Sequence, residues 1–86
     1  MKPHHRRAVE ALTQRYQADP TCRALVLVGS IAAGNASDAS DIDYIAVVTD
    51  EEFARRRATC SVHNILRDIC EYPGGYAEGK HVPLAS

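Results

Sequence analysis

The apolar residues nearest the N-terminus recur at the spacing of a helix. Within residues 4–17, Val9, Leu12 and Tyr16 are separated by three and four positions, so they line one face of an amphipathic helix. This helix is expected to end before Pro20, because the residue that precedes a proline is disfavoured in the helical region. The chain therefore begins with a helix that has one face to bury.

Two later runs have the patterns of strands. Residues 23–28 (RALVLV) form an almost continuous apolar run between turn residues, which predicts a strand buried on both faces. Residues 42–48 alternate instead, which predicts a second strand. Between them, Gly29-Ser30 ends the first strand, residues 31–33 begin a short helix, and the small polar residues 36–40 are typical of a loop.

The second half of the chain predicts one long helix followed by a hairpin. Thr49 or Asp50 is suited to cap a helix whose first turn is acidic, and apolar residues share a helical face to about residue 71. The tail 76–84 is expected to form a hairpin that turns at Glu78-Gly79. Helix, strand, short helix, strand, long helix and hairpin together predict a small α/β or α+β domain, with helices flanking one sheet.

Length and composition limit the class of protein. A chain of 86 residues is expected to be a single domain, and its 45% hydrophobic and 24% charged residues exclude a disordered one. The net charge of −1 gives no strong signal for nucleic acid or an acidic membrane. No apolar run approaches the roughly 20 residues that span a bilayer, and no apolar segment follows the basic N-terminus. With three irregularly spaced cysteines, we expect a cytoplasmic protein with reduced thiols.

Two carboxylates stand at the start of the second predicted strand. Asp41 and Asp43 are two positions apart, and side chains at that spacing on a strand point the same way, roughly 6.5–7 Å apart along the backbone. Like charges held together are unfavourable unless a cation lies between them or one of them takes up a proton. Mg²⁺ and Mn²⁺ suit such oxygen ligands, usually together with substrate phosphates. The alternative is an acidic pair at a solvated strand edge.

Gly29 and Ser30 follow the first predicted strand and directly precede the short helix. Ligands gather at the carboxyl ends of strands in α/β sheets, and a helix N-terminus offers unpaired N–H groups to a phosphate. Glycine lets the backbone approach a ligand closely, and Ser30 adds a hydroxyl donor. By themselves the two residues are more typical of a tight turn with an N-cap. Beside a metal-binding carboxylate pair, they outline a site for a nucleoside triphosphate.

Gly29-Ser30, ten intervening residues and then Asp41-Ile42-Asp43 resemble the signature of the DNA polymerase β-like nucleotidyltransferase superfamily. The strongest similarity is to its minimal and kanamycin nucleotidyltransferase-like members, over residues 23–50. The resemblance implies transfer of a nucleoside monophosphate from a nucleoside triphosphate, with ATP as the expected one, to an acceptor. It also implies that Gly29 and Ser30 hold the triphosphate and that Asp41 and Asp43 are the catalytic ligands of Mg²⁺ or Mn²⁺.

Catalytic members of this family usually carry a third carboxylate on a later strand, which helps to deprotonate the acceptor. The corresponding strand is expected at residues 80–84, which contain no acid, and Pro83 suits an edge strand there. The nearest acids are Glu71, at the end of the long helix, and Glu78, at the expected hairpin tip. Neither has favourable predicted geometry. Asp38 is interpreted as a loop or capping residue.

Two function hypotheses follow. The first is a metal-dependent nucleotidyltransferase, either minimal and dependent on a partner for its acceptor site, or shortened at the C-terminus with impaired catalysis. The second is a catalytically weak binding module of the same fold. Minimal nucleotidyltransferases that this chain resembles often act as the antitoxin of a HEPN-domain protein. The expected partners are therefore a second copy of the chain or a HEPN-type protein, since an open sheet edge needs covering.

Overall fold

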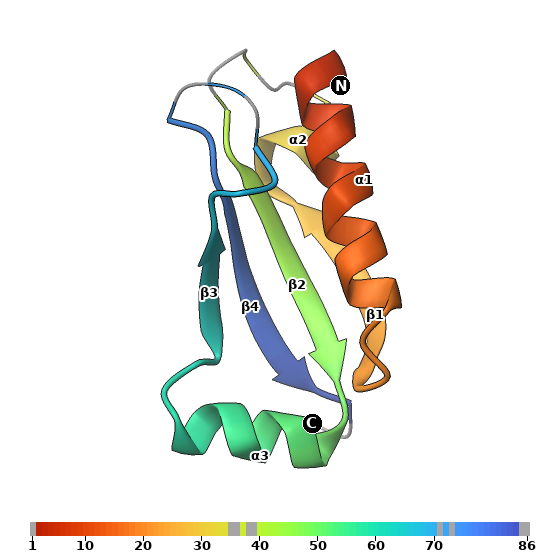
Figure 1. The fold of residues 1–86 in the computed structure, drawn as a ribbon, viewed down its shortest axis with the longest axis vertical. Helices are drawn as coiled ribbons and strands as arrows, with labels where there is room; N and C mark the ends of the chain where they lie inside the picture. Colours follow the sequence, from red (N-terminus) through yellow and green to blue (C-terminus); the bar gives the residue numbers. More distant parts are fainter. Residues whose placement is uncertain (1, 35–36, 38–39, 71, 73, 85–86) are drawn as a thin grey trace.

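The structure is a computed structural model, which describes residues 2–34, 37, 40–70, 72 and 74–84. These residues form three helices and four strands. The helices are α1 (Pro3–Gln17), α2 (Gly29–Ala33) and α3 (Asp50–Ala58). The strands are β1 (Cys22–Val28), β2 (Ile42–Val48), β3 (His63–Leu66) and β4 (Ala77–Pro83). They form one mixed sheet in the order β1-β2-β4-β3, with β2 and β4 parallel and the other neighbours antiparallel (Figure 1). The predicted α+β class is confirmed.

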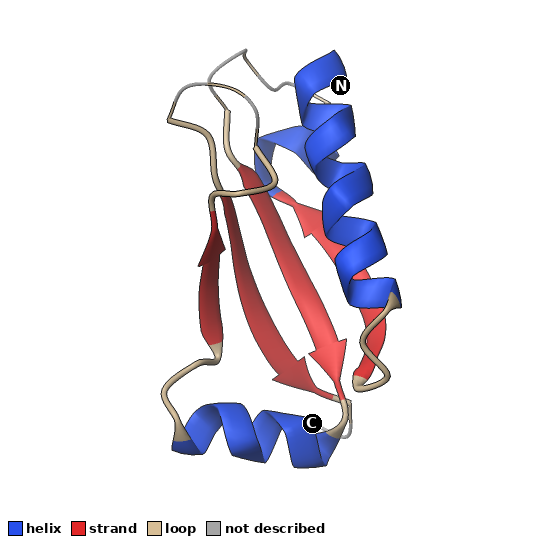
Figure 2. Cartoon of the chain, in the orientation of Figure 1, coloured by secondary structure: helices blue, strands red, loops and turns tan. Residues whose placement is uncertain are grey.

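The core lies between the helices and one face of the sheet. α1 contributes its apolar stripe, as its spacing predicted, and contacts β1 and β2. α3 lies across the end of the sheet at which β2 and β4 finish (Figure 2). The buried apolar cluster consists of Ala8, Leu12, Tyr16, Ile31, Ile42, Tyr44, Ala46, Val48, Ile69 and Ala77.

The other side of the sheet is not covered by any helix of the described residues. Along β2, alternate residues are buried, and those between them are half-exposed on this second face. The strand registers place residues of the other strands beside them. We call this the open face, and it carries Ala24, Val26, Val28, Asp43, Ile45, Val47, Glu78, Lys80, Val82, His63 and Ile65.

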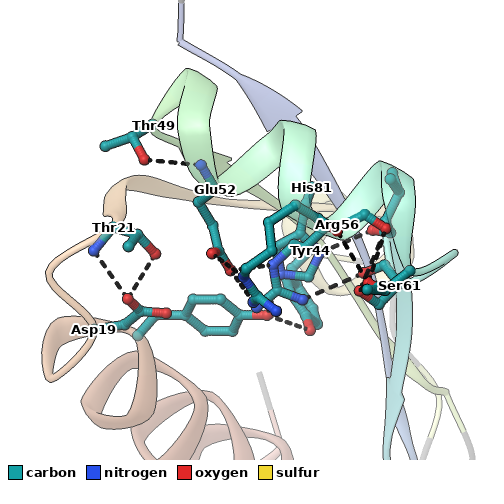
Figure 3. Close-up of polar contacts among 12 residues, drawn as sticks. Asp19, Thr21, Tyr44, Thr49, Glu52, Arg56, Ser61 and His81 are labelled. Carbon is teal, nitrogen blue, oxygen red and sulfur yellow. Dashed lines mark hydrogen bonds and ion pairs between the residues drawn. The ribbon is translucent and has the colours of Figure 1, made fainter.

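A polar network inside the core ties β2, β4 and α1 together. The Nδ1 atom of His81 donates to the carbonyl of Val62 (2.8 Å), so its Nε2 accepts from the Tyr16 hydroxyl (2.8 Å). The oxygen of Tyr16 in turn accepts from the hydroxyl of Tyr44 (2.9 Å). Nearby, Arg56 of α3 bonds buried Glu52 (2.8 Å), as Figure 3 shows. Because each member has a partner, the buried polar groups hold the register of β2 against β4.

α3 begins where the sequence predicted but ends much earlier. The amide of Glu52 bonds the hydroxyl of Thr49 (3.3 Å), which is the expected cap. The helix then stops at Ala58, so the prediction of a helix to about residue 71 was wrong. The hydroxyl of Thr59 bonds carbonyls of the last helical turn, Cys60 takes a left-handed backbone (φ 57°), and the following residues enter β3. The helical spacing of the apolar residues that follow Ala58 therefore does not reflect a helix.

The prediction of a hairpin turning at Glu78-Gly79 was also wrong. β4 runs without a turn through both residues, and it lies between β2 and β3 rather than at an edge. Pro83 is tolerated because it is the last residue of the strand. Gly79 serves packing: a β-carbon there would collide with the ring of Tyr44.

β1 is the edge strand that the sequence predicted to be buried on both faces. Leu25 and Leu27 pack against the core, as expected. On the open face, however, Val26 keeps 45% of its surface exposed. The continuous apolar run of β1 therefore has one face that packs against the core and one face that is exposed.

Candidate functional site

Gly29 lies directly against the carboxylate of Asp43. β1 and β2 pair so that Val28 is opposite Asp43, and the chain turns into α2 at the next residue. Gly29 has φ 72°, in the left-handed region, and a β-carbon at this position would lie 2.5 Å from Asp43 Oδ2. Only glycine satisfies both constraints. The two halves of the sequence motif are thus brought together in space.

Glu78 was predicted to lie at the tip of a hairpin, with unfavourable geometry for a third carboxylate. The parallel register of β2 and β4 sets Glu78 beside Asp43, with both side chains on the open face. Because β4 begins at Ala77 rather than at residue 80, the strand next to Asp43 does contain an acid. The sequence signal that was missed is the alternation of small buried residues (Ala77, Gly79) around Glu78, which is typical of a strand and not of a turn.

Asp41 lies just before β2, which begins at Ile42. The pKa of Tyr76 is raised, first of all by its side-chain interaction with the Asp41 carboxylate. The ring of Tyr76 also lies 5.3 Å below the guanidinium of Arg67. Asp41 is therefore near Asp43 but is held toward the segment that leads into β4.

The carboxylates at this end of the sheet repel one another. The pKa of Asp43 is raised, first because partial burial disfavours its charged form and then because of the negative charges of Glu78 and Asp41. Crowded carboxylates of this kind are stabilised by a proton or by a cation. The electrostatics therefore favour either a proton on Asp43 or a cation beside it.

A divalent cation fits this donor set only with help from a ligand. In the described residues, no group of three or more His, Cys, Asp and Glu side chains is arranged closely enough to hold a metal ion. Asp43 supplies a hard oxygen ligand, with Asp41 and Glu78 close by, which suits the one or two carboxylates through which Mg²⁺ is commonly bound. The remaining coordination positions would be filled by phosphate oxygens and water. A metal ion here would thus need ligands other than these side chains.

An open depression of about 660 Å³ extends from Asp43 across the open face. At one side, His63 Nε2 bonds Glu78 Oε1 (2.9 Å), and both side chains are partly exposed. Lys80 follows on the same face of β4, beside Ile45. The depression therefore has the carboxylates of Asp43 and Glu78 at the end nearest Gly29, and Lys80 lies further along. His63 and Lys80 had no sequence signal, because their proximity depends on the pairing of β3 with β4.

Two aromatic residues fix the backbone immediately before Asp41. The carbonyl of Ser40 accepts hydrogen bonds from His5 Nε2 (2.9 Å) and from the Tyr72 hydroxyl (2.9 Å). His5 is fully buried in α1, so the N-terminal helix helps to position the backbone at Ser40, directly before Asp41. Ser30 lies in α2, partly buried, directly after Gly29. Two further sequence candidates, Asp38 and Glu71, lie outside the described residues.

Comparisons with known proteins found no matching family model, no matching curated protein and no matching solved structure. The resemblance to nucleotidyltransferases therefore rests on the sequence motif alone. None of the helices in the described part of the chain has the length and apolar character needed to cross a membrane.

Proposed function

We propose that this chain is a metal-dependent nucleotidyltransferase, which transfers a nucleoside monophosphate from a nucleoside triphosphate, with ATP the expected one, to an acceptor. The observation that carries the proposal is the meeting of Gly29, Asp43 and Glu78 at one end of the open face. The three come from β1–α2, β2 and β4, so the sequence motif alone did not require them to meet. A glycine that touches a carboxylate, next to a second carboxylate on a parallel strand, supports binding of a metal–triphosphate complex.

In this proposal each residue has a separate task. The backbone of Gly29 and the hydroxyl of Ser30 hold the triphosphate, while Asp41 and Asp43 bind Mg²⁺ or Mn²⁺. The metal supplies charge neutralisation for the phosphate oxygens. The acceptor oxygen bonds to the α-phosphorus, the bond to pyrophosphate breaks, and Glu78 takes the acceptor proton. His63 holds Oε1 of Glu78, which orients that carboxylate.

The test is a transfer assay with α-labelled nucleoside triphosphates and Mg²⁺ or Mn²⁺ in lysate of the source cells. Wild-type protein is expected to place label on a macromolecule or a small molecule. The double variant Asp41→Asn, Asp43→Asn and the single variant Glu78→Gln are expected to lose at least about 10²-fold in rate, since each removes charge that acts on the reacting groups. Glu51→Gln, an exposed carboxylate of α3, serves as the matched control and is expected to retain activity.

Circular dichroism of each variant establishes that it is folded before its rate is compared. Full activity in the folded Asp41→Asn, Asp43→Asn variant would disprove the proposed role of the acidic pair. Full activity in Glu78→Gln would instead remove Glu78 from the mechanism and leave the acidic pair in place.

A second candidate function, a binding module of this fold, is favoured by the apolar side chains on the open face. Val26 and Ile65 keep 45% and 46% of their surfaces exposed. Such residues are typical of a surface that another chain covers, including a HEPN-type partner in an antitoxin-like pair. Wild-type protein that is folded, transfers no label with any nucleotide or acceptor source, and binds a partner would favour this function over catalysis.

A further inference from the structure

The two edges of the sheet differ in how well they are protected from pairing with another strand. β1 and β3 are the outer strands, and no described segment pairs with their outer sides. β3 has only four residues, with His63 at its start. β1 has seven residues, and its last five, 24–28 (ALVLV), contain no charge and no proline. Proteins usually protect an edge of that length with charges, prolines or bulges.

The protection that β1 has is confined to one end. The register irregularity between Cys22 and Ala24 and the single charge of Arg23 both lie at the start of the strand. From Ala24 to Val28 the pairing with β2 is regular. This part of the strand therefore presents a row of backbone donors and acceptors on its outer side, next to an exposed Val26.

We propose that β1 pairs with β1 of a second copy of this chain, antiparallel about a two-fold axis at Val26. In this register Ala24 pairs with the partner copy's Val28, and Leu25 pairs with the partner copy's Leu27. Apolar residues then meet apolar residues on both faces, and β-branched neighbours such as two Val26 side chains stabilise a sheet. Two four-stranded sheets become one continuous sheet of eight strands. The inference rests on the strand edge and is independent of the proposed transfer reaction.

The distribution of charge favours this antiparallel arrangement. Arg23 lies at one end of β1, and the acidic end of the sheet lies at the other, where Val28 pairs with Asp43 and Asp43 with Glu78. Antiparallel pairing separates the two Arg23 residues and brings each one level with Gly29 of the other copy. A positive charge is thus added to the crowded carboxylate end of each sheet. Parallel pairing would set the two arginines side by side.

A second copy also suits this edge better than the opposite edge of another molecule. Pairing of β1 with β3 would leave one edge free at each end, so such contacts would continue into an open chain of molecules. Pairing of β1 with β1 uses the same surface on both copies and closes after two. What remains exposed is β3, the shorter and more polar edge.

The experiment measures the mass of the purified full chain by light scattering coupled to size exclusion, over a wide range of concentration. The wild type is expected to reach about twice the 9.4 kDa of one chain. Val26→Arg, which places two like charges opposite each other at the two-fold axis, is expected to be monomeric. Ile65→Arg is the matched control, because Ile65 is equally exposed on the same face but lies on β3, and it is expected to remain dimeric. Circular dichroism verifies that both variants are folded.

A second measurement tests the register. In a background with Cys22, Cys60 and Cys70 replaced by alanine, Val26→Cys is expected to form a disulfide-linked dimer on mild oxidation, because the two side chains face each other at close range. Ile65→Cys is expected to give none. A wild type that is monomeric at every concentration, a dimer that Ile65→Arg disrupts as strongly as Val26→Arg, or a Val26→Cys variant that does not cross-link would each overturn the proposal.

Discussion

Gly29 and Asp43 show how strongly a single position can depend on its neighbour. Gly29 has a left-handed backbone, and it also leaves no room for a β-carbon beside Asp43. The first property belongs to the turn between β1 and α2, whereas the second belongs to the pairing of β1 with β2. The molecule offers a comparison, since Gly34 has nearly the same φ (78°) but no heavy atom within 4 Å of its hypothetical β-carbon.

Substitution of these two glycines separates backbone strain from collision. Gly34→Ala is expected to lower the free energy of unfolding by about 1 kcal/mol, the cost of a left-handed alanine. Gly29→Ala is expected to lower it by about 2–4 kcal/mol, because displacement of Asp43 is added. Urea unfolding of both variants gives the comparison. Equal losses would show that the contact with Asp43 does not constrain this position.

Between elements, the register of β2 and β4 determines which residues reach the open face. Tyr44 follows Asp43 and points to the core, where its ring lies against the backbone of β4 at Gly79. Gly79 in turn follows Glu78. One contact on the buried side therefore accompanies the pairing of the two carboxylates on the other side. The glycine at position 79 is therefore required by packing against Tyr44 and not by a turn.

The fit of Tyr44 against Gly79 can be tested by a double-mutant cycle. Gly79→Ala is expected to destabilise the fold by about 2–3 kcal/mol, because the new methyl group meets the tyrosine ring. In a Tyr44→Ala background the ring is absent, so the same substitution is expected to cost much less. Denaturant unfolding of the two single variants and the double variant measures the coupling. Additive losses would contradict the contact.

At the scale of the whole molecule, the buried network of His81, Tyr16 and Tyr44 joins β4, α1 and β2 in one cooperative unit. Burial lowers the pKa of His81 and raises that of Tyr44, so both are neutral in the fold. A neutral His81 that donates to Val62 can only accept at its other nitrogen. The network therefore has a single direction of donation, and protonation of His81 reverses it.

The stability of the protein should consequently decrease in mild acid. Because the folded pKa of His81 lies below its ordinary value of 6.5, the unfolded chain takes up the proton first. The free energy of unfolding is then expected to fall as the pH drops below about 6.5, by at most about 1.4 kcal/mol per pH unit. Glu52, whose pKa is lowered by its arginine partners, adds a further loss only below about its ordinary value of 4.5.

Unfolding curves at a series of pH values check this expectation. His81→Gln is expected to be less stable than the wild type well above neutrality, where it lacks the native hydrogen bonds, but to lose less stability between neutral and mildly acidic pH. Parallel pH profiles for the two proteins would show that His81 does not cause the acid sensitivity.

The sequence by itself determined most of the local elements of the first half and the start of α3. The spacing of the apolar residues in α1, the alternation in β2, the cap of α3 and the end of β1 before Gly29 are all set by short-range preferences, so they were predicted correctly. The short helix begins at Gly29, two residues earlier than predicted. The short-range pattern misled where tertiary pairing decides between structures. The apolar residues of 62–69 have helical spacing, yet residues 63–66 form β3 because β4 offers a partner strand. Glu78 was predicted at the tip of a hairpin, yet it lies in a central strand.

Only the tertiary structure decided which distant residues meet. The pairing of β1 with β2 sets Gly29 against Asp43, and the parallel pairing of β2 with β4 sets Glu78 beside them. The order of the strands also places β1 at an edge of the sheet, although its apolar run predicted a strand covered on both faces. The physical reason is that strand order and register depend on packing between segments far apart in the chain, whereas hydrophobic periodicity records only the burial of each segment by itself.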